Sequence, residues 1–320
     1  MCGIAGIHFK QAVDSGVLDQ AAAHFARSLK HRGPDAFGAH RTDRAVYANL
    51  RLAIVDRSGG DQPIYAPDAA RGIVYNGEVY NWQALREPLE ASYPFSTQAD
   101  TEAVLATVLA QGDAGLAQLN GMFALCVWND HDGSFLLARD RFGAKPLYVY
   151  EDANCIAFAS ELRTLLGLPG LDHTLDPVGF QDYLSYRYNL APHTQFLRIR
   201  KLTAGCVLRL NGGVSEIHRF ADVSLHEPVP DHTRPEQSYI DELDQLLGKA
   251  VQSQLMGEVP IGVLLSGGLD SSAIAAYVHR AGARLKAYSI GFPEVNEFEF
   301  SREVARHFNQ IGRASCRERV

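Results

Sequence analysis

The chain has 320 residues, which leaves room for two domains at roughly 150 residues each. Its 46% hydrophobic and 21% charged residues are typical of a globular protein. A net charge of −7 without any basic block argues against nucleic-acid binding. No apolar run approaches the ~20 residues of a membrane helix, and the first residues lack the features of a signal peptide.

The five cysteines are odd in number and form no Cys-x-x-Cys pair. This argues against a disulfide framework and against a zinc site, and together with the lack of Asn-x-Ser/Thr sequons it predicts a reducing, cytoplasmic environment. Cys126, Cys155 and Cys206 stand in apolar, strand-like runs, so we expect them in the core.

Cys2 directly follows the initiator methionine. Aminopeptidases remove Met1 when the next side chain is small, and Cys2 would then carry both a thiol and a free α-amine. An α-amine with a pKa of roughly 8 can act as a base near neutral pH, so the residue would be a nucleophile with its own base. The alternative is a buried cysteine without chemistry. Cys2 alone does not separate the two.

The first half of the chain alternates predicted strands and helices. Strands are expected over 2–9 and 46–55, with a helix over 18–29 between them. Arg51 lies inside the second apolar run and needs a partner there, either a structural carboxylate or an anionic ligand. His31, in a Gly-Pro turn after the helix, is expected to be a structural hydrogen-bonding residue.

Asn76 and Gly77 follow an apolar strand at 73–75. Asn-Gly is a strong turn signal, which favours a hairpin. Alternatively, the amide of Asn76 and the backbone N–H of Gly77 are two donors for an oxyanion.

Further elements are expected downstream. A short helix is predicted over 84–89, and Asp100 is placed to cap a helix over 103–109. Two strand pairs are predicted, 121–128 with 135–140 and 146–150 with 155–159.

The second half begins after a stretch rich in Pro, His and acidic residues at 221–236, which we interpret as a linker. An amphipathic helix is predicted over 240–255. An apolar strand then leads into the glycine-rich turn Ser-Gly-Gly-Leu-Asp-Ser at 266–271 and a helix from Ser271. Such a turn can bind anions through its backbone N–H groups, although it is not a Walker A loop. Another apolar strand is expected over 285–290.

Several of these stretches together resemble the class II glutamine amidotransferases, most of all the glutamine-hydrolysing asparagine synthetases. The matching residues are Cys-Gly-Ile at 2–4, His-Arg-Gly-Pro-Asp at 31–35, Arg-Leu-Ala-Ile-Val-Asp at 51–56, Asn-Gly-Glu at 76–78, Asp100 and Arg-Asp-Arg-Phe-Gly at 139–143. The resemblance implies an α+β fold, the four-layer αββα sandwich of N-terminal nucleophile hydrolases. The start of an α/β ATP-pyrophosphatase domain follows it. The implied boundaries are a glutaminase domain at 1–220, the linker at 221–236 and a partial synthetase domain at 237–310.

The resemblance also implies roles for individual residues. Cys2 attacks the glutamine side-chain amide, while Asn76 and Gly77 stabilise the oxyanion. Arg51 receives the α-carboxylate in a bidentate contact. The remaining implied glutamine-binding residues are Leu52, Ala53, Ile54, Val55, Asn76, Gly77, Glu78 and Asp100. The chain departs from the family pattern at 98–99, where Gln-Ala stands in place of a frequent Gly-Ser.

The turn at 266–271 resembles the pyrophosphate loop of ATP-pyrophosphatases. The implied ATP-binding residues are Leu265, Ser266, Gly267, Gly268, Asp270, Ser271 and Ile290. Asp270 is implied to help hold Mg²⁺ through pyrophosphate, and no organic prosthetic group is implied. The implied substrates are glutamine, ATP and aspartate, whose β-carboxylate ATP would activate as an adenylate. We expect no nucleic-acid or membrane partner, and the family relationship makes a homodimer an option.

The last residues, 311–320, lack periodicity and do not resemble the family. They match the translation of a sequencing adapter, and we interpret them as a non-native tail on a C-terminally truncated chain. We therefore expect the apolar residues Val263, Leu265 and Ile290 to lack covering layers. Two other functions stay open, namely an amidotransferase of secondary-metabolite or cell-surface biosynthesis with another carboxylate acceptor, and a non-catalytic protein of this fold.

Overall fold

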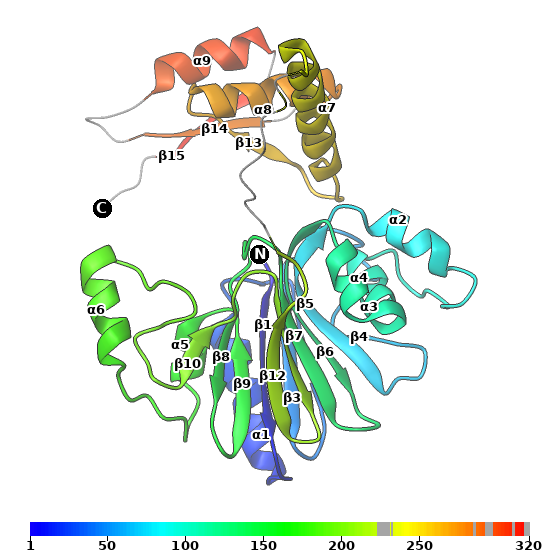
Figure 1. Cartoon of the computed structure of the whole chain (residues 1–320), viewed down its shortest axis with the longest axis vertical. Helices are drawn as coiled ribbons and strands as arrows, with labels where there is room; N and C mark the ends of the chain where they lie inside the picture. The colour runs from blue at the N-terminus through cyan, green and yellow to red at the C-terminus, as the bar shows by residue number, and fades with distance from the viewer. Residues whose placement is uncertain (223–230, 232, 284–285, 292–296, 309–310, 317–320) are drawn as a thin grey trace. The chain divides into compact units, whose positions relative to one another are not determined.

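The computed structural model divides the chain into two compact units, Met1–Leu225 and His226–Val320. It describes residues 1–320 except 223–230, 232, 284–285, 292–296, 309–310 and 317–320. The linker predicted over 221–236 therefore lies largely outside the described residues. Figure 1 shows both units, and each is described here by itself.

The first unit contains two six-stranded sheets in which every neighbouring pair of strands is antiparallel. The first sheet has the order β10-β8-β9-β1-β3-β2. Its strands are β1 (Gly3–Phe9), β2 (Ala36–Arg41), β3 (Ala45–Arg51), β8 (Tyr148–Glu151), β9 (Cys155–Ala159) and β10 (Ile199–Lys201). The second sheet has the order β12-β11-β7-β6-β5-β4. Its strands are β4 (Ile64–Tyr65), β5 (Arg71–Val79), β6 (Gly121–Asn129), β7 (Ser134–Arg139), β11 (Cys206–Asn211) and β12 (Val214–Arg219).

Three apolar cores hold four layers together. The central core contains residues from both sheets and none from a helix, such as Tyr47 and Phe158 of the first sheet and Trp128 of the second. A second core joins the first sheet to α1 (Ser15–Ser28) and α5 (Leu162–Leu166). A third joins the second sheet to the helices α2 (Trp82–Arg86), α3 (Asp100–Gln111) and α4 (Asp113–Gln118), with the 3₁₀ turn η1 (Glu87–Leu89) after α2. The expected αββα sandwich is therefore confirmed.

The periodicity of the sequence explains why these elements form. In β1 the side chain of Ile4 enters the central core, whereas those of Ala5 and Ile7 face α1, so a strand buried on both faces carries a continuous apolar run. The predicted pairings of 121–128 with 135–140 and of 146–150 with 155–159 are confirmed by β6–β7 and β8–β9. Cys126, Cys155 and Cys206 are buried, as expected.

The second unit is a three-stranded parallel sheet with helices. Its strands are β13 (Gly262–Leu264), β14 (Lys286–Ile290) and β15 (Ile311–Cys316), and its helices are α7 (Glu236–Gln254), α8 (Leu269–Arg280) and α9 (Phe298–His307). Val263 and Leu265 are buried against Ala275 and neighbouring residues of α9. The expectation that these two side chains lack a cover is therefore wrong, whereas Ile290 is 65% exposed.

Two sequence-based interpretations of the backbone structure are also wrong. The apolar run 46–55 is a strand only as far as Arg51, and residues 52–55 form a loop. Asn76 and Gly77 lie inside the continuous strand β5 rather than in a hairpin turn, because both pair with β6. The segment 311–316 forms β15, since backbone pairing with β14 needs no side-chain periodicity. Its origin as a non-native tail stays a prediction.

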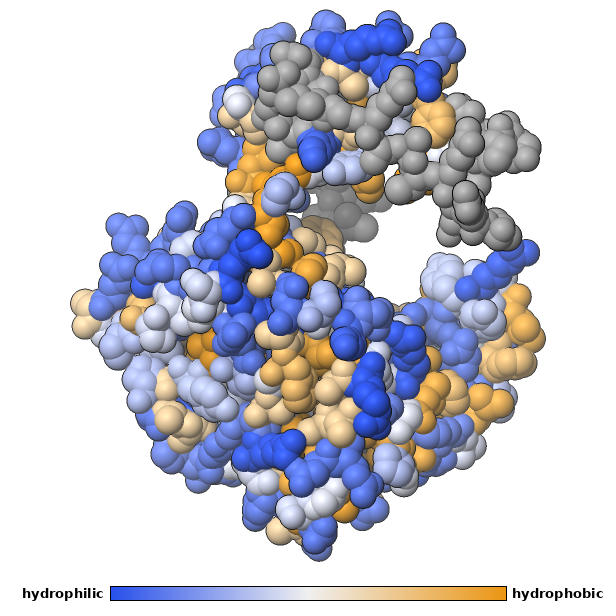
Figure 2. Space-filling view, turned by 180° about the vertical axis from the view of Figure 1, so that it is seen from behind, coloured by the Kyte–Doolittle hydropathy of each residue, from blue (hydrophilic) through white to orange (hydrophobic). Residues whose placement is uncertain are grey.

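Apolar side chains are exposed on and around α6 (Pro177–Tyr186), which begins at the N-cap Asp176. Val178, Phe180 and Leu184 on this helix are between 45% and 67% exposed. Figure 2 shows orange surface on this side of the first unit. Across the described part of the chain, no helix combines the length and the apolar character that a membrane span requires.

Candidate active site

A pocket opens beside the start of β1. Its walls come from β1, the end of β3 with the loop after it, β5 and the start of α3. The lining residues are Met1, Cys2, Arg51, Leu52, Ile54, Val55, Gly60, Gln62, Tyr75, Asn76, Gly77, Glu78, Ala99, Asp100, Thr101 and Lys145. The structure thus brings together every residue of the predicted glutamine site except Ala53.

Cys2 holds its thiol in this pocket. The backbone N–H of Leu52 donates a hydrogen bond to Sγ at 3.3 Å, and Sγ lies 3.6 Å from the carbonyl oxygen of the same residue. Burial raises the pKa of the Cys2 thiol. Burial also lowers the pKa of the chain's α-amine, which Met1 carries here. The thiol therefore needs a base to ionise at neutral pH.

Asn76 and Gly77 of β5 supply donors to the pocket. Asn76 is 1% exposed, and its Nδ2 is a buried donor without a hydrogen-bond partner in the described part of the chain. Such a group costs free energy unless a ligand satisfies it. A Cβ atom at Gly77 would lie 2.4 Å from the carbonyl oxygen of Met122 and 2.7 Å from Cβ of Phe123. Only glycine therefore fits at this point of β5.

Arg51 lines the pocket but already has partners within the chain. Its Nη1 donates to Oδ1 of Asp61 at 2.6 Å, and its Nη2 donates to the carbonyl oxygen of Asp56 at 2.6 Å. Further bonds go to the carbonyl oxygens of Val55 and Arg57. The sequence left a structural carboxylate and an anionic ligand open as partners, and Asp61 is such a carboxylate. Its side chain is 70% exposed, so a ligand carboxylate could replace it at little cost.

Two carboxylates face the same space. Asp100 is 5% exposed and accepts hydrogen bonds through Oδ2 from the hydroxyl of Tyr75 at 3.0 Å and from the N–H of Val79 at 3.1 Å. Burial raises the pKa of Asp100 to about 6. The expected capping role is wrong, because Asp100 is itself the first residue of α3 and Ala99 occupies the N-cap position. Burial also raises the pKa of Glu78, against the opposing effect of Lys145.

Lys145 is one of several lining residues that the sequence analysis missed, together with Gly60, Gln62, Tyr75, Ala99 and Thr101. It is 5% exposed, its Nζ lies 3.3 Å from Sδ of Met1, and burial lowers its pKa. The preceding turn is held by Asp140, whose carboxylate accepts backbone hydrogen bonds from Phe123, Phe142, Ala144 and Lys145. The motif at 139–143 ends two residues before this lysine, and following the segment further would have found it.

Residues 52–55 shape the rim of the pocket. Leu52, Ile54 and Val55 line it, whereas Ala53 does not and instead donates its N–H to Asp35 at 2.8 Å. Asp35 belongs to the His-Arg-Gly-Pro-Asp segment, so that segment supports the site from outside.

The predicted nucleotide loop lies between β13 and α8 in the second unit. Oγ of Ser266 lies 3.0 Å from Oγ of Ser271 and accepts a hydrogen bond from the N–H of Gly268 at 3.2 Å. Gly267 has φ of +89°, and a Cβ there would meet Cβ of Phe300 at 2.5 Å, so the turn requires glycine. The helix begins at Leu269 rather than at Ser271.

The other predicted nucleotide residues differ in exposure. Leu265 is buried, whereas Ser266, Asp270 and Ile290 are exposed. Over the described ranges, no three His, Cys, Asp or Glu side chains group as a metal site. One exposed carboxylate at a helix N-terminus nevertheless fits a Mg²⁺ ion that is bound mainly through the phosphates of a nucleotide.

The sandwich and its N-terminal cysteine pocket define a class II glutamine amidotransferase fold and site. Residues 1–221 match the family model described as a glutamine amidotransferase domain, and the chain belongs to this family. Residues 242–313 match a second model, described as asparagine synthase. The resemblance to glutamine-hydrolysing asparagine synthetases is thereby confirmed.

Curated relatives carry the same combination. The chain is 32% identical over 311 residues to asparagine synthetase [glutamine-hydrolyzing] 1 of Bacillus subtilis, covering 95% of this chain and 48% of that protein. It is 32% identical over 326 residues to asparagine synthetase B [glutamine-hydrolyzing] of Escherichia coli, covering 97% and 53%. The chain thus spans about half the length of these relatives.

A solved structure supports the fold alone. The glutamine phosphoribosylpyrophosphate amidotransferase from B. subtilis, complexed with ADP and GMP, matches with a TM-score of 0.50 at 15% identity. The match covers 97% of this chain and 64% of that one.

Proposed function

We propose that the first unit is a glutaminase that releases ammonia from glutamine and forms part of a glutamine-dependent asparagine synthetase. The buried, unpartnered Nδ2 of Asn76 carries this proposal, because it is a donor that lines the same pocket as the Cys2 thiol. An oxyanion formed in that pocket would satisfy it. The partial match in length makes the activity of the whole protein part of the proposal.

The residues of the pocket suit each step of an acyl transfer. The Cys2 thiol transfers its proton to the α-amine of the same residue, and Sγ attacks the side-chain carbonyl carbon of glutamine. Asn76 and the N–H of Gly77 stabilise the resulting oxyanion. The oxyanion collapses, the C–N bond breaks, and the protonated α-amine supplies the proton with which ammonia leaves. Water then hydrolyses the thioester and releases glutamate.

The polar groups around the thiol orient the substrate. Arg51 binds the α-carboxylate in place of Asp61, while Glu78 and Asp100 bind the α-ammonium group. Met1 lines the pocket in this structure, and its removal would both free the α-amine of Cys2 and enlarge the space near Lys145.

In the whole protein the second unit would activate the acceptor. The loop Ser266–Ser271 would bind ATP, and Asp270 would help to hold Mg²⁺, which would stabilise the charge of the phosphates. ATP would activate the β-carboxylate of aspartate. The asparagine synthase match over 242–313 and the names of the relatives support aspartate as the acceptor. A cytoplasmic location and a homodimer complete the proposal, supported by the cysteine content and by the family relationship respectively.

The test is to supply the purified chain with glutamine and to measure glutamate and ammonia. Equal amounts of both products are expected, and intact-mass analysis of the active sample should show that Met1 is absent. An active sample that retains Met1 would contradict the role of the α-amine, and a well-folded sample without glutamate release would contradict the glutaminase itself.

A further inference from the structure

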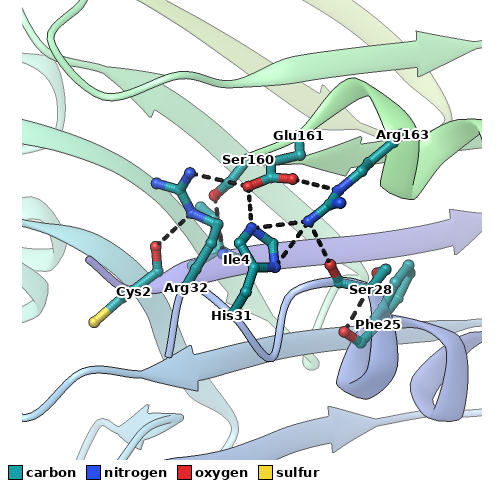
Figure 3. Close-up of polar contacts among 9 residues, drawn as sticks. All are labelled: Cys2, Ile4, Phe25, Ser28, His31, Arg32, Ser160, Glu161 and Arg163. Carbon is teal, nitrogen blue, oxygen red and sulfur yellow. Dashed lines mark hydrogen bonds and ion pairs between the residues drawn. The ribbon is translucent and has the colours of Figure 1, made fainter. Parts of the chain in front are cut away.

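A cluster of polar and charged side chains contacts the backbone of Cys2. None of its members lines the pocket. Figure 3 shows this Glu161 cluster, which consists of Glu161, Arg32, His31 and Arg163. The carboxylate of Glu161 lies at its centre. Oε1 accepts a hydrogen bond from Nη1 of Arg32 at 3.1 Å and lies 2.7 Å from Nε2 of His31, and Oε2 accepts one from Nε of Arg163 at 2.7 Å.

The cluster reaches the nucleophile through one hydrogen bond. Nε of Arg32 donates to the carbonyl oxygen of Cys2 at 3.0 Å. In Figure 3 the Cys2 thiol points away from this bond. Ser160, next to Glu161, holds Ile4 near the start of β1. Its Oγ accepts a hydrogen bond from the N–H of Ile4 at 3.0 Å, and its N–H donates to the carbonyl oxygen of Ile4 at 2.8 Å.

The covalent geometry of Cys2 explains how the carboxylate of Glu161 can affect the thiol without touching it. The thiol, the α-amine and the carbonyl of Cys2 are all attached through the same Cα, so fixing the carbonyl limits the orientation of the other two groups. Cys2 precedes β1, which begins at Gly3, so the strand ladder does not hold this residue. The hydrogen bond from Arg32 to the Cys2 carbonyl fixes the residue instead, and Glu161 in turn binds the guanidinium of Arg32.

Glu161 keeps its negative charge, and so its bond to Arg32, at neutral pH. The side chains of Arg32 and Glu161 are 11% and 20% exposed, so solvent screens their hydrogen bond only in part. Burial alone would raise the pKa of Glu161, but hydrogen bonds from His31, Arg32 and Arg163 lower it. The carboxylate is therefore charged throughout the neutral range.

We propose that Glu161 is a positioning residue of the glutaminase site, which holds Arg32 against the Cys2 carbonyl and so orients the thiol and the α-amine. This inference rests on the proposed glutaminase function. It assigns Glu161 no contact with substrate, and its effect on catalysis passes entirely through Arg32.

The first test is Glu161→Gln, which keeps the shape of the side chain and removes its charge. We expect kcat for glutamine hydrolysis to fall about tenfold, since small displacements of a nucleophile are costly, while KM changes less than about twofold. Glu151→Gln is the matched control. Glu151 is 25% exposed, pairs with Arg200 at 2.8 Å, and lies in the same sheet in register with the far end of β1. Its kcat should change less than about twofold.

A double-mutant cycle tests the route. If Glu161 acts through Arg32, then Glu161→Gln should cause no further loss of kcat in an Arg32→Ala background. Losses that multiply would overturn the proposal. A wild-type value of kcat in Glu161→Gln would do the same, as would a loss that merely follows the unfolded fraction measured by thermal melting.

Labelling of Cys2 separates orientation from access and does not need turnover. A diazoketone analogue of glutamine requires an oriented thiol, and its reaction with Glu161→Gln should slow about tenfold, in parallel with kcat. Iodoacetamide reacts with any accessible thiolate whatever its orientation, so at alkaline pH, where the thiol ionises without the help of the α-amine, it should react at the wild-type rate. Equal slowing of both reagents would overturn the proposal. If wild-type protein releases no glutamate and resists the diazoketone, the glutaminase function itself has failed, which is a different result.

Discussion

Helices α3 and α7 show how differently the two units bury their side chains. All nine residues from Asp100 to Val108 in α3 are buried, whereas none of the 19 residues of α7 is. The apolar positions predicted for α7 do share a face, yet Ile240, Leu243 and Leu247 are between 39% and 57% exposed. The sequence thus predicts a helix in both units, but among the described residues α3 is covered by its neighbours and α7 is not.

The candidate sites differ in the same way. In the pocket of the first unit, Asn76, Arg51 and Asp100 are each at most 5% exposed. In the nucleotide loop, Ser266 and Asp270 are exposed, and the supporting core has four buried members among the described residues, namely Val263, Leu265, Ala275 and Ala287. Buried donors and charges are already oriented for a ligand, whereas exposed ones must be ordered by it. We therefore expect activity from the first site and little from the second.

The largest expected effect is the loss of all glutaminase activity in Cys2→Ala. The substitution removes the nucleophile, while a single half-buried thiol contributes little to packing, so the melting temperature should stay within about 3 °C of wild type. Glutamate release and thermal melting measure the two quantities. A large loss of stability would show instead that Cys2 is a structural core residue.

Asn76→Ala should lower kcat about 10²- to 10³-fold, because it removes one donor from the proposed oxyanion site. Asn81→Ala is the matched control, since Asn81 follows the same strand but bonds the backbone of Gln118 and Asn120 outside the pocket. Its kcat should remain close to wild type. Similar losses of kcat in both variants would indicate a general effect on β5. The buried amide of Asn76 would then have no special role as an oxyanion donor.

Arg51→Lys should raise KM for glutamine about tenfold and change kcat much less, because lysine keeps the charge but loses the planar fork that binds a carboxylate. Asp61→Asn separates the two roles of Arg51. If Asp61 is only a partner that the substrate replaces, this variant should bind glutamine at least as well as wild type. A raised KM in Asp61→Asn would show that the ion pair positions Arg51.

These three residues show what the sequence could and could not supply. The family resemblance assigned roles to Cys2, Asn76 and Arg51, and the structure places all three around one pocket. The sequence could not show that Asp61 pairs with Arg51 or that Lys145 lines the pocket, since both contacts depend on how the chain folds after β3 and around Asp140. Nor could it show that Asn-Gly continues a strand, because pairing with β6 overrides the local turn preference.

The pH dependence of glutamine binding should identify Asp100. Its pKa is raised to about 6, so protonation below that pH removes the negative charge that binds the α-ammonium group. KM should therefore rise about tenfold per pH unit below pH ~6 and level off above it. Asp100→Asn should show a high KM with no such dependence. An unchanged slope in that variant would assign the titration to another group.

The smallest expected effect is that of ATP, aspartate and Mg²⁺ on this chain. Release of glutamate should change less than about twofold when they are added, and no asparagine should form. The reason is that Ser266 and Asp270 of the nucleotide loop are exposed, on a sheet of three strands. ATP would have to order these side chains when it binds, and this ordering would weaken its binding. Following glutamate, pyrophosphate and asparagine separately tests this difference between the units. Asparagine and pyrophosphate in equal amounts, both lost in Asp270→Asn, would show that the second unit is a complete synthetase site despite its small core.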